Sequence, residues 1–404
     1  MSETNTQHAA DLMRTFAEQT GLTPAVRPPR RYLWTDAYAV CNYLELYRQT
    51  GQLQYQQLAL ELIEHVHWGL GRFRESDSRI GWISGLSEAA GAMHPTAGGL
   101  RIGKKLAERR PEEAFDARLE WDRDGQYFHY LTKWAHALAM AAEATQDENY
   151  ARWAIELADA AHDAFVYAAA PHGLKQMYWK MSTDLSYPLV PSMGHHDPLD
   201  GLVTAWTLRA CAETMLAGYD FATLDRQALD FAEMSVARNW DTDDALGLGG
   251  LLFDAARIVR LIGLGHPIDP ALLVAVLAAA IRGLTALLST NALDYPAGNR
   301  LAFRELGLAI GLHSISIATT STSFDMLSPR QVSEIEYLLN RAVEFCPVAE
   351  KIEDFWLSDH NQAAASWREH RDINMVMLAS GLLPNSMQRA KAATEPRAST
   401  GGAK

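Results

Sequence analysis

The sequence has little of what would mark a disulfide framework, a zinc cluster or a nucleic-acid-binding surface. Its 404 residues include three cysteines, Cys41, Cys211 and Cys346, which lie far apart without Cys-x-x-Cys spacing. We therefore expect three buried free thiols and no metal cluster. The 36 Lys and Arg residues form no run, and the net charge is −13. Because phosphate binding needs a basic footprint, this charge argues against a nucleic-acid partner.

Segments that would divide or target the chain are also missing. No stretch rich in Pro, Gly and Ser separates parts of different composition, so one large domain over residues 1–385 fits the length. Residues 1–20 lack an apolar core of signal-peptide length, and Arg282 and Gly283 interrupt the apolar run 271–288. We expect a cytoplasmic protein with no membrane partner, and a disordered tail over residues 386–404.

What the chain does have is an apolar core composition and an internal repeat. Hydrophobic residues make up 48% and charged residues 21% of the sequence, as in a folded protein with a large core. The segment 50–67 recurs as 145–162, with matching Tyr, Ala, Glu, Leu and His positions. Each copy lies between two long amphipathic segments, so the repeated unit is a helical hairpin.

The 3.6-residue period of apolar residues predicts twelve helices and favours no strand. Their expected ranges are 8–19, 33–50, 53–70, 124–145, 147–167, 198–217, 222–237, 243–263, 270–288, 300–318, 329–345 and 360–381. Every second helix, from 33–50 onward, is rich in small and apolar residues, so we place these six inside and their partners outside. The pattern predicts an all-α fold, an (α/α)6 toroid of six helical hairpins. An open superhelical solenoid is the alternative, because hairpin repeats do not require closure.

Most of the expected inner helices begin with a cluster of polar and aromatic residues. In a toroid these six starts meet at one mouth, together with the long connections 72–123 and 168–197. Long loops on a rigid helical scaffold are the usual location of function. The sequence therefore predicts a funnel ringed by carboxylates, His and Trp.

Carboxylates at these helix starts are the candidate catalytic groups. Asp before a helix is also a preferred cap, so any single Asp here is more often a cap than a catalyst. The groups around residues 120–124 and 195–200 exceed what one cap requires. We expect Asp122 and Asp197 to act as the acid and base pair. The reserve positions are Asp36, Asp124, Asp200 and Asp243.

Aromatic and polar residues near the same starts are the candidate binding residues. An aromatic ring suits the C–H face of a sugar, while charged and amide groups bind its hydroxyls. The expected binding residues are Trp34, Trp82, Gln126, Tyr127, Trp179, His195, His196, Arg304, Glu305 and His360. Adjacent histidines seldom point at one ion, so we expect no metal and no cofactor. The expected partner is a small-molecule substrate, a mono- or oligosaccharide.

With its helix count, hairpin repeat and polar mouth, the chain resembles the six-hairpin glycosidase superfamily over about residues 8–383. It is loosely similar to unsaturated glucuronyl and rhamnogalacturonyl hydrolases, which use Asp residues at the starts of successive inner helices. That resemblance implies catalytic roles for Asp122 or Asp124 and for Asp197 or Asp200. The histidines that precede Asp197 would assist binding.

A second similarity is to the N-acylglucosamine 2-epimerase and aldose isomerase group, which uses two histidines as acid and base. It implies that His360 or His370, on the last inner helix, is one of them. The partner is expected on the helix over 243–263, but no His lies between Asp241 and Gly265. This departure ranks an epimerase below a hydrolase.

These observations predict a carbohydrate-active enzyme, a glycoside hydrolase that uses paired Asp residues at the barrel mouth as general acid and base. A sugar 2-epimerase or aldose isomerase is one alternative, and a non-catalytic sugar-binding or scaffold protein is another. A weaker one is alkene protonation as in class II terpene cyclases. Residues 241–244 match their Asp-x-Asp-Asp pattern, but the Gln-Trp motifs that such cyclases often carry are absent.

Overall fold

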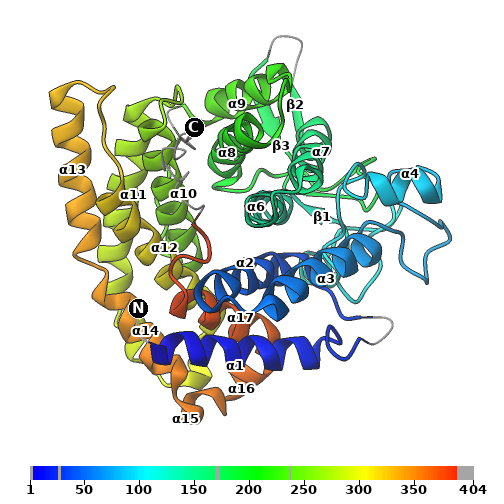
Figure 1. Ribbon diagram of the computed structural model, residues 1–404, viewed down its shortest axis with the longest axis horizontal. Helices are drawn as coiled ribbons and strands as arrows, with labels where there is room; N and C mark the ends of the chain where they lie inside the picture. Colours follow the sequence, from blue (N-terminus) through cyan, green and yellow to red (C-terminus); the bar gives the residue numbers. More distant parts are fainter. Residues whose placement is uncertain (1–2, 26–28, 169–172, 237, 389–404) are drawn as a thin grey trace, which may run out of the picture.

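The computed structural model describes residues 3–25, 29–168, 173–236 and 238–388 (Figure 1). Six helices form an inner ring: α2 (Leu33–Thr50), α6 (Phe128–Thr145), α8 (Asp197–Met215), α10 (Ala245–Gly263), α12 (Ala302–Ser321) and α17 (Arg371–Leu382). The outer helices that pack on them are α3 (Leu53–Leu70), α7 (Glu148–Phe165), α9 (Ala222–Ser235), α11 (Pro270–Ser289), α13 (Pro329–Val343) with α14 (Pro347–Leu357), and α1 (Glu3–Gln19).

The inner helices close into a ring. Each contacts the next in chain order, from α2 through α6, α8, α10 and α12 to α17, and α17 in turn contacts α2. Figure 1 shows α10 to α13 at the left of the molecule and α6 to α9 at the upper right, with α1, α2, α3 and α17 below α6 to α9. The predicted (α/α)6 toroid is therefore confirmed, and an open solenoid is ruled out.

The sequence repeat is a repeat of structure. Gly51 and Gln146, which follow α2 and α6, both have left-handed backbone angles, with φ of 69° and 58°. His67 and His162 lie in the last turns of α3 and α7, and both are buried. Nε2 of His67 accepts a hydrogen bond from α6 at 3.2 Å, and Nε2 of His162 is bonded to α9 at 2.9 Å. Each histidine thus fastens its outer helix to the hairpin that follows.

Two inner helices, α10 and α12, approach each other backbone to backbone. A Cβ atom added to Gly249 would lie 2.1 Å from the carbonyl oxygen of Gly307, and one added to Gly311 would lie 2.4 Å from that of Gly249. Only glycine allows this approach, since real Cβ contacts are never so short. The glycine-rich sequence of these helices is therefore a packing requirement of the ring.

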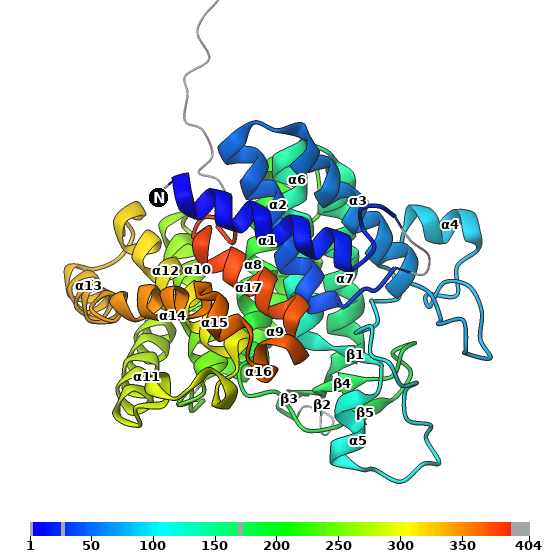
Figure 2. The same ribbon diagram turned by 90° about the horizontal axis from the view of Figure 1, so that it is seen from below.

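Short elements that the sequence did not predict occupy the long connections. They are α4 (Glu88–Met93), α5 (Ala117–Asp122), β1 (Gln126–Tyr127), β2 (Val166–Ala168), β3 (Lys175–Met177), β4 (Lys180–Met181), β5 (Pro188–Val190), and two 3-10 turns, Ala292–Asp294 and Ala297–Asn299. One antiparallel sheet has the order β1-β4-β5, and β2 pairs with β3. Figure 2 shows α5, β1, β4 and β5 together at one edge. The expectation of no strand is wrong because strands of two or three residues leave no periodic pattern.

The predicted helix over 360–381 is also wrong in its first half. Its place is taken by α15 (Asp359–Gln362), α16 (Ala365–Glu369) and the shorter inner helix α17. The break lets Trp367 stack on Trp356 at 5.6 Å, and lets the hydroxyl of Ser366 donate to the carbonyl of Ala297 at 2.6 Å. Burial of the two indoles therefore overrides helix continuity.

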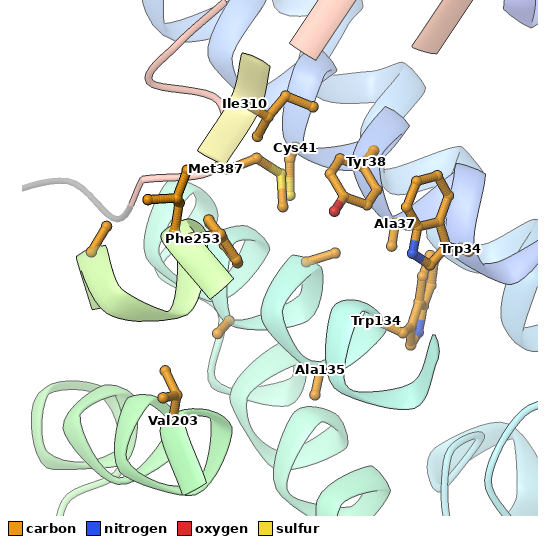
Figure 3. Packing of buried hydrophobic residues seen from close by; sticks show 14 of the residues in the cluster. Trp34, Ala37, Tyr38, Cys41, Trp134, Ala135, Val203, Phe253, Ile310 and Met387 are labelled. Carbon is orange, nitrogen blue, oxygen red and sulfur yellow. The ribbon is translucent and has the colours of Figure 1, made fainter. Parts of the chain in front are cut away.

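Beyond α17 the chain turns back into the ring. Met387 is 3% exposed, and Figure 3 shows it among Cys41, Phe253 and Ile310, which come from three inner helices. Ser386 is buried as well. The folded part thus reaches past the predicted boundary at residue 386, and the remainder of the predicted tail, 389–404, lies outside the described residues.

Among the described helices, α11 alone is long and apolar enough to span a membrane by length and composition. Its mean hydropathy is 2.3, and 39% of the apolar stretch is buried within the protein. It contacts α10 on one side and α13 on the other. Its apolar sequence thus serves at least in part to pack the outer ring.

Candidate active site

The six inner helices begin at the same end of the ring. The contacts that join successive starts are Tyr32 with Tyr130, His129 with Asp197, His196 with Trp240, Asp244 with Arg304, Phe303 with His370, and Arg30 with Asp372. We call this end of the ring the mouth. Five residues there form a cluster that we call the mouth cluster: His129, Lys133, His196, Asp197 and Asp200.

Asp197, the first residue of α8, has a buried carboxyl group with a free oxygen. Its Oδ2 has no hydrogen-bond partner among the described residues. Burial, together with the negative charge of Asp200, raises the pKa of Asp197 to about 7. Nδ1 of His129 lies 3.7 Å from Oδ1 of Asp197, slightly too far for a hydrogen bond. An acid that is partly protonated at neutral pH therefore lies beside an imidazole.

The two histidines of the mouth cluster are neutral at physiological pH. Burial lowers the pKa of His129 to about 4, and burial and the neighbouring His195 lower that of His196 to about 4. Within the described part of the chain, Nδ1 of His129 and Nε2 of His196 are buried and bonded to nothing. Buried polar atoms are normally hydrogen-bonded, so three such atoms close to one another indicate a place for a ligand.

Beneath Asp197 a network of charges forms the floor of the site. Nζ of Lys133 lies 2.9 Å from both carboxylate oxygens of Asp200, and Oγ1 of Thr132 donates to Oδ2 at 2.5 Å. Arg257 lies 3.5 Å from Asp200 and 3.3 Å from Asp254. Although burial alone would raise it, Lys133 and Arg257 hold the pKa of Asp200 below its usual value. Asp200 is thus a fixed anion.

Asp254 is the second carboxyl group of this floor. Burial and the charge of Asp200 raise its pKa to about 7. Asp197 and Asp254 therefore both hold protons near neutral pH, and the fixed anion Asp200 raises the pKa of each. Perturbed pKa values of this kind gather at functional sites, although buried ion-pair networks also produce them.

Aromatic rings line one side of the mouth cluster. Trp179, in the turn between β3 and β4, is stacked with His129 at 6.4 Å and lies 5.2 Å from Tyr127. Tyr127 lies 5.2 Å from Tyr130, which lies 6.4 Å from Trp34 at the start of α2. We call Trp34, Tyr127, Tyr130 and Trp179 the aromatic wall. Trp34 and Tyr127 are buried and support the wall, so the half-buried rings of Tyr130 and Trp179 provide the flat apolar surface that a sugar face requires.

Arg238 holds the loop that precedes α8. Its guanidinium donates to the carbonyl of His195 at 3.1 Å and to that of Gly194 at 3.2 Å, and contacts Sδ of Met193 at 3.8 Å. Its positive charge also lowers the pKa of Asp197, against the larger effect of burial. Arg238 therefore sets both the backbone beside Asp197 and part of its electrostatic environment.

The mouth thus brings together seven of the residues that the sequence predicts. They are Trp34, Tyr127, Trp179, His195, His196, Asp197 and Asp200. His195 is exposed and lies 4.5 Å from His196, ring to ring. These residues share the starts of α2, α6 and α8 and the loops beside them.

Four predicted residues of the first two helix starts have structural roles outside the mouth cluster. Asp36 accepts a hydrogen bond from the backbone of Tyr32 at 3.0 Å and pairs with Arg31, and burial raises its pKa to about 6. Asp124 pairs with Arg101 at 2.5 Å. The remaining two are Gln126, whose amide is bonded to the backbone of residues 98, 100 and 183, and Asp122, which is exposed at the end of α5.

The other predicted residues also lie outside it. Asp243 is exposed, and Arg304 pairs with Asp244, the cap of α10, at 2.5 Å. Glu305 accepts hydrogen bonds from Arg300 and from Trp356, which it holds in the core. His360 is exposed on α15, and Trp82 is buried 6.0 Å from Trp68, beside α3. Of these groups, Arg304 and Glu305 join helices through their ion pairs and hydrogen bonds.

Sequence reasoning missed His129, Lys133, Asp254 and Arg257. A signal was present, since Lys133 is the only Lys or Arg of α6, and Asp254 interrupts an apolar run of α10. His129 and Lys133 are four residues apart and so share one helix face. A charged residue inside an apolar inner helix is buried within the ring. Such residues lie beyond the helix starts from which the site was predicted.

Among the described residues, no three His, Cys, Asp or Glu side chains are grouped so that they could hold a metal ion.

Comparison with solved structures finds similar folds. An α-mannanase of family GH76 from Bacteroides thetaiotaomicron has a TM-score of 0.51 at 8% identity, over 94% of this chain and 95% of its own. A cellobiose 2-epimerase from Spirochaeta thermophila has a TM-score of 0.47 at 12% identity over 86% of each chain, and a polysaccharide lyase 0.45 at 11% identity over 95% and 99%. No protein-family model and no curated protein matches the chain. The likeness to the mannanase structure shows a shared fold.

Proposed function

We propose that the protein is a carbohydrate-active enzyme and that the mouth cluster is its active site. The observation that carries the proposal is the unbonded, buried Oδ2 of Asp197, on a carboxyl group with a pKa raised to about 7, beside the neutral His129. A general acid works best when its pKa lies near the working pH. The aromatic wall supplies the surface on which a sugar ring stacks. The similarity in fold to an α-mannanase agrees with such a substrate.

Glycoside hydrolysis is the reaction that we propose first. The protonated carboxyl group of Asp197 donates its proton to the glycosidic oxygen as the bond from that oxygen to the anomeric carbon breaks. Because His129 lies only 3.7 Å from Asp197, too close for water to attack from the opposite face, a water molecule adds to the anomeric carbon from the side that the leaving group has vacated, and His129 accepts its proton. The imidazolium then returns a proton to Asp197 across the 3.7 Å gap, which restores both groups. An imidazole here takes the part that the sequence assigned to a second carboxylate, Asp122.

Isomerisation or epimerisation is the second candidate, because two neutral imidazoles with unbonded nitrogens lie next to Asp197. One of them would remove a proton from a carbon beside a carbonyl group of an open-chain sugar, and an acid would deliver a proton to the product. His129 and His196 would then take the parts of the histidine that the resemblance placed on the last inner helix and of its partner, which was expected over residues 243–263.

A substrate screen with matched variants tests the proposal. The purified protein is incubated with libraries of glycosides and free sugars, and products are detected by mass spectrometry and by reducing-end assay. Asp197→Asn should lower kcat at least about 100-fold while the Tm stays close to that of the wild type. Asp241→Asn, which removes an exposed carboxylate paired with Arg282, should change neither. Unchanged turnover in Asp197→Asn would contradict the assignment of Asp197 as the general acid.

The pH profile and isotope labelling distinguish the chemistry. Asp197 must be protonated and His129 neutral, so kcat/KM should fall above about pH 7 and below about pH 4. Hydrolysis places oxygen from labelled water in the product, whereas isomerisation places solvent deuterium on carbon. Asp122→Asn tests the pair of Asp122 and Asp197 that the sequence predicts. A loss of turnover equal to that of Asp197→Asn would support Asp122, and not His129, as the base.

A further inference from the structure

Trp121 is an unusually exposed indole next to the proposed site. It lies on α5, and 55% of its surface is open to solvent, while the ring beside it, Trp179, belongs to the aromatic wall. The two ring centroids are 5.3 Å apart, with the planes at 78°. Trp121 therefore extends the aromatic wall outward to the rim of the mouth.

The exposure of Trp121 does not come from a loose segment. Asp116 caps α5 by accepting hydrogen bonds from the backbone of residues 118 and 119. The buried Glu120 accepts from Nζ of Lys180 at 2.8 Å and from Nε of Arg109 at 3.2 Å. Lys180 also donates to the carbonyls of residues 120 and 123. The indole is thus presented to solvent from a clamped support, as a binding platform requires.

The rings lead from the rim to the proposed acid. Trp121 contacts Trp179, Trp179 is stacked with His129, and His129 lies 3.7 Å from Asp197. This succession exceeds the footprint of one sugar ring. A substrate with one unit at Asp197 can therefore continue across Trp179 to a further unit on Trp121.

The buried cations behind these rings are already paired. Lys180 and Arg109 bind Glu120, and Arg123 pairs with Glu113. These three charges are paired, and the exposed charges of α5, Arg118 and Asp122, have opposite signs, so the support of Trp121 offers no net positive charge to an anionic group and recognition falls to stacking and to hydroxyl contacts. The rim then favours an uncharged sugar chain.

We propose that Trp121 forms an outer subsite, and that the substrate is a neutral linear oligosaccharide or polysaccharide chain of which Trp121 binds a unit remote from Asp197. This inference rests on the proposed function, because it takes Asp197 as the reacting end of the path. It assigns the protein to chain-acting enzymes and not to enzymes of free monosaccharides.

Binding measured against chain length tests the subsite. Calorimetry uses gluco- and manno-oligosaccharides of one to six units with the Asp197→Asn protein, so that no turnover interferes. Affinity should rise with length, and adding Trp121→Ala should cost about 5- to 10-fold in Kd for the long chains but leave the shortest ligand unaffected. Trp121→Phe should restore part of the loss. The control is Trp68→Ala, an indole that is 60% exposed on α3 away from the path, and it should change nothing.

The outcomes separate the two proposals. If long chains bind equally well with and without Trp121, the outer subsite is wrong and the active-site assignment stands. If no sugar of any length binds or reacts, the proposed function itself fails. If Trp121→Ala instead abolishes a dimer seen by light scattering without changing sugar binding, the exposed indole is a protein interface and the subsite is overturned.

Discussion

The carboxylate of Asp197 lies directly against the α-carbon of Gly194, so that a Cβ atom there would come within 2.1 Å of its Oδ2. The glycine is three residues before the acid, in the loop that Arg238 holds. The absence of a side chain at residue 194 thus gives the carboxyl group its room. The position of the proposed acid is set by the loop as well as by α8.

Gly194→Ala should displace this carboxylate. Because misplacement of a reacting group by about 1 Å can cost on the order of 100-fold, we expect kcat to fall about 10- to 100-fold. Thermal unfolding should change little, since the loop lies at the mouth. Gly250→Ala is the control, because a Cβ there meets nothing within 4 Å. Full activity in Gly194→Ala would show that the carboxyl group moves freely.

Arg238→Gln should move the alkaline limb of the pH profile upward. The guanidinium lowers the pKa of Asp197, so its loss raises that pKa and keeps the acid protonated to higher pH. Arg238→Lys keeps the positive charge but cannot donate to both carbonyls, of residues 194 and 195, in the same way. It should therefore leave the alkaline limb in place and lower kcat. The measurement is kcat/KM from pH 4 to 9. A limb that stays in place in Arg238→Gln contradicts the electrostatic role.

Lys133→Met should destabilise the protein by about 3–5 kcal/mol at pH 7, because it leaves Asp200 buried with a weaker counter-charge. Lys133 contributes to the lowered pKa of Asp200, so its stabilisation is present above the unfolded pKa of 3.8 and is lost as pH falls through the folded value. Urea unfolding at pH 7 and at about pH 3, below the unfolded pKa, should therefore show a smaller deficit at the lower pH. Lys351→Met, which breaks an exposed pair with Asp294, should cost less than about 1 kcal/mol. An equal deficit at both pH values would point to lost packing instead.

Met387→Ala should destabilise the ring by about 2–4 kcal/mol, because it empties a buried site among three inner helices (Figure 3). Met326→Ala, at a side chain that is 81% exposed, should stay within about 0.5 kcal/mol of the wild type. Both are measured by chemical unfolding. Equal stabilities would mean that the segment after α17 does not contribute to the core.

The ring could be predicted because five of its six inner helices carry an apolar sequence and short connections. The sixth could not, since α17 is shortened by the stacking of Trp367 on Trp356, a contact between residues that no local pattern relates. The site was predicted in part for a similar reason. Asp197 and Asp200 open α8 and were visible as polar residues at a helix start.

The start of α6 shows why the rest was missed. Gln126 and Tyr127 pair with β4, so the helix begins at Phe128, Asp122 lies at the end of α5 and Asp124 lies in the loop after it. The residues that face Asp197 are therefore His129 and Lys133, one turn further on. The helix begins at Phe128 and not at residue 124, because the two residues of β1 precede it. The sequence prediction therefore named residues beside the mouth cluster instead of residues within it.

The return of residues 383–388 into the ring bears on how the chain folds during synthesis. α17 contacts both α1 and α2, so the last wall of the ring joins the first, and the segment after it fills the interior. During synthesis, the ring cannot close until residues 371–388 have left the ribosome. Until then the faces of α1, α2 and α12 that pack on α17 stay uncovered. Contacts between such distant parts of a chain form slowly, and the uncovered faces are prone to aggregation. Translation speed and chaperone supply, more than the stability of any one hairpin, should govern the yield of native protein.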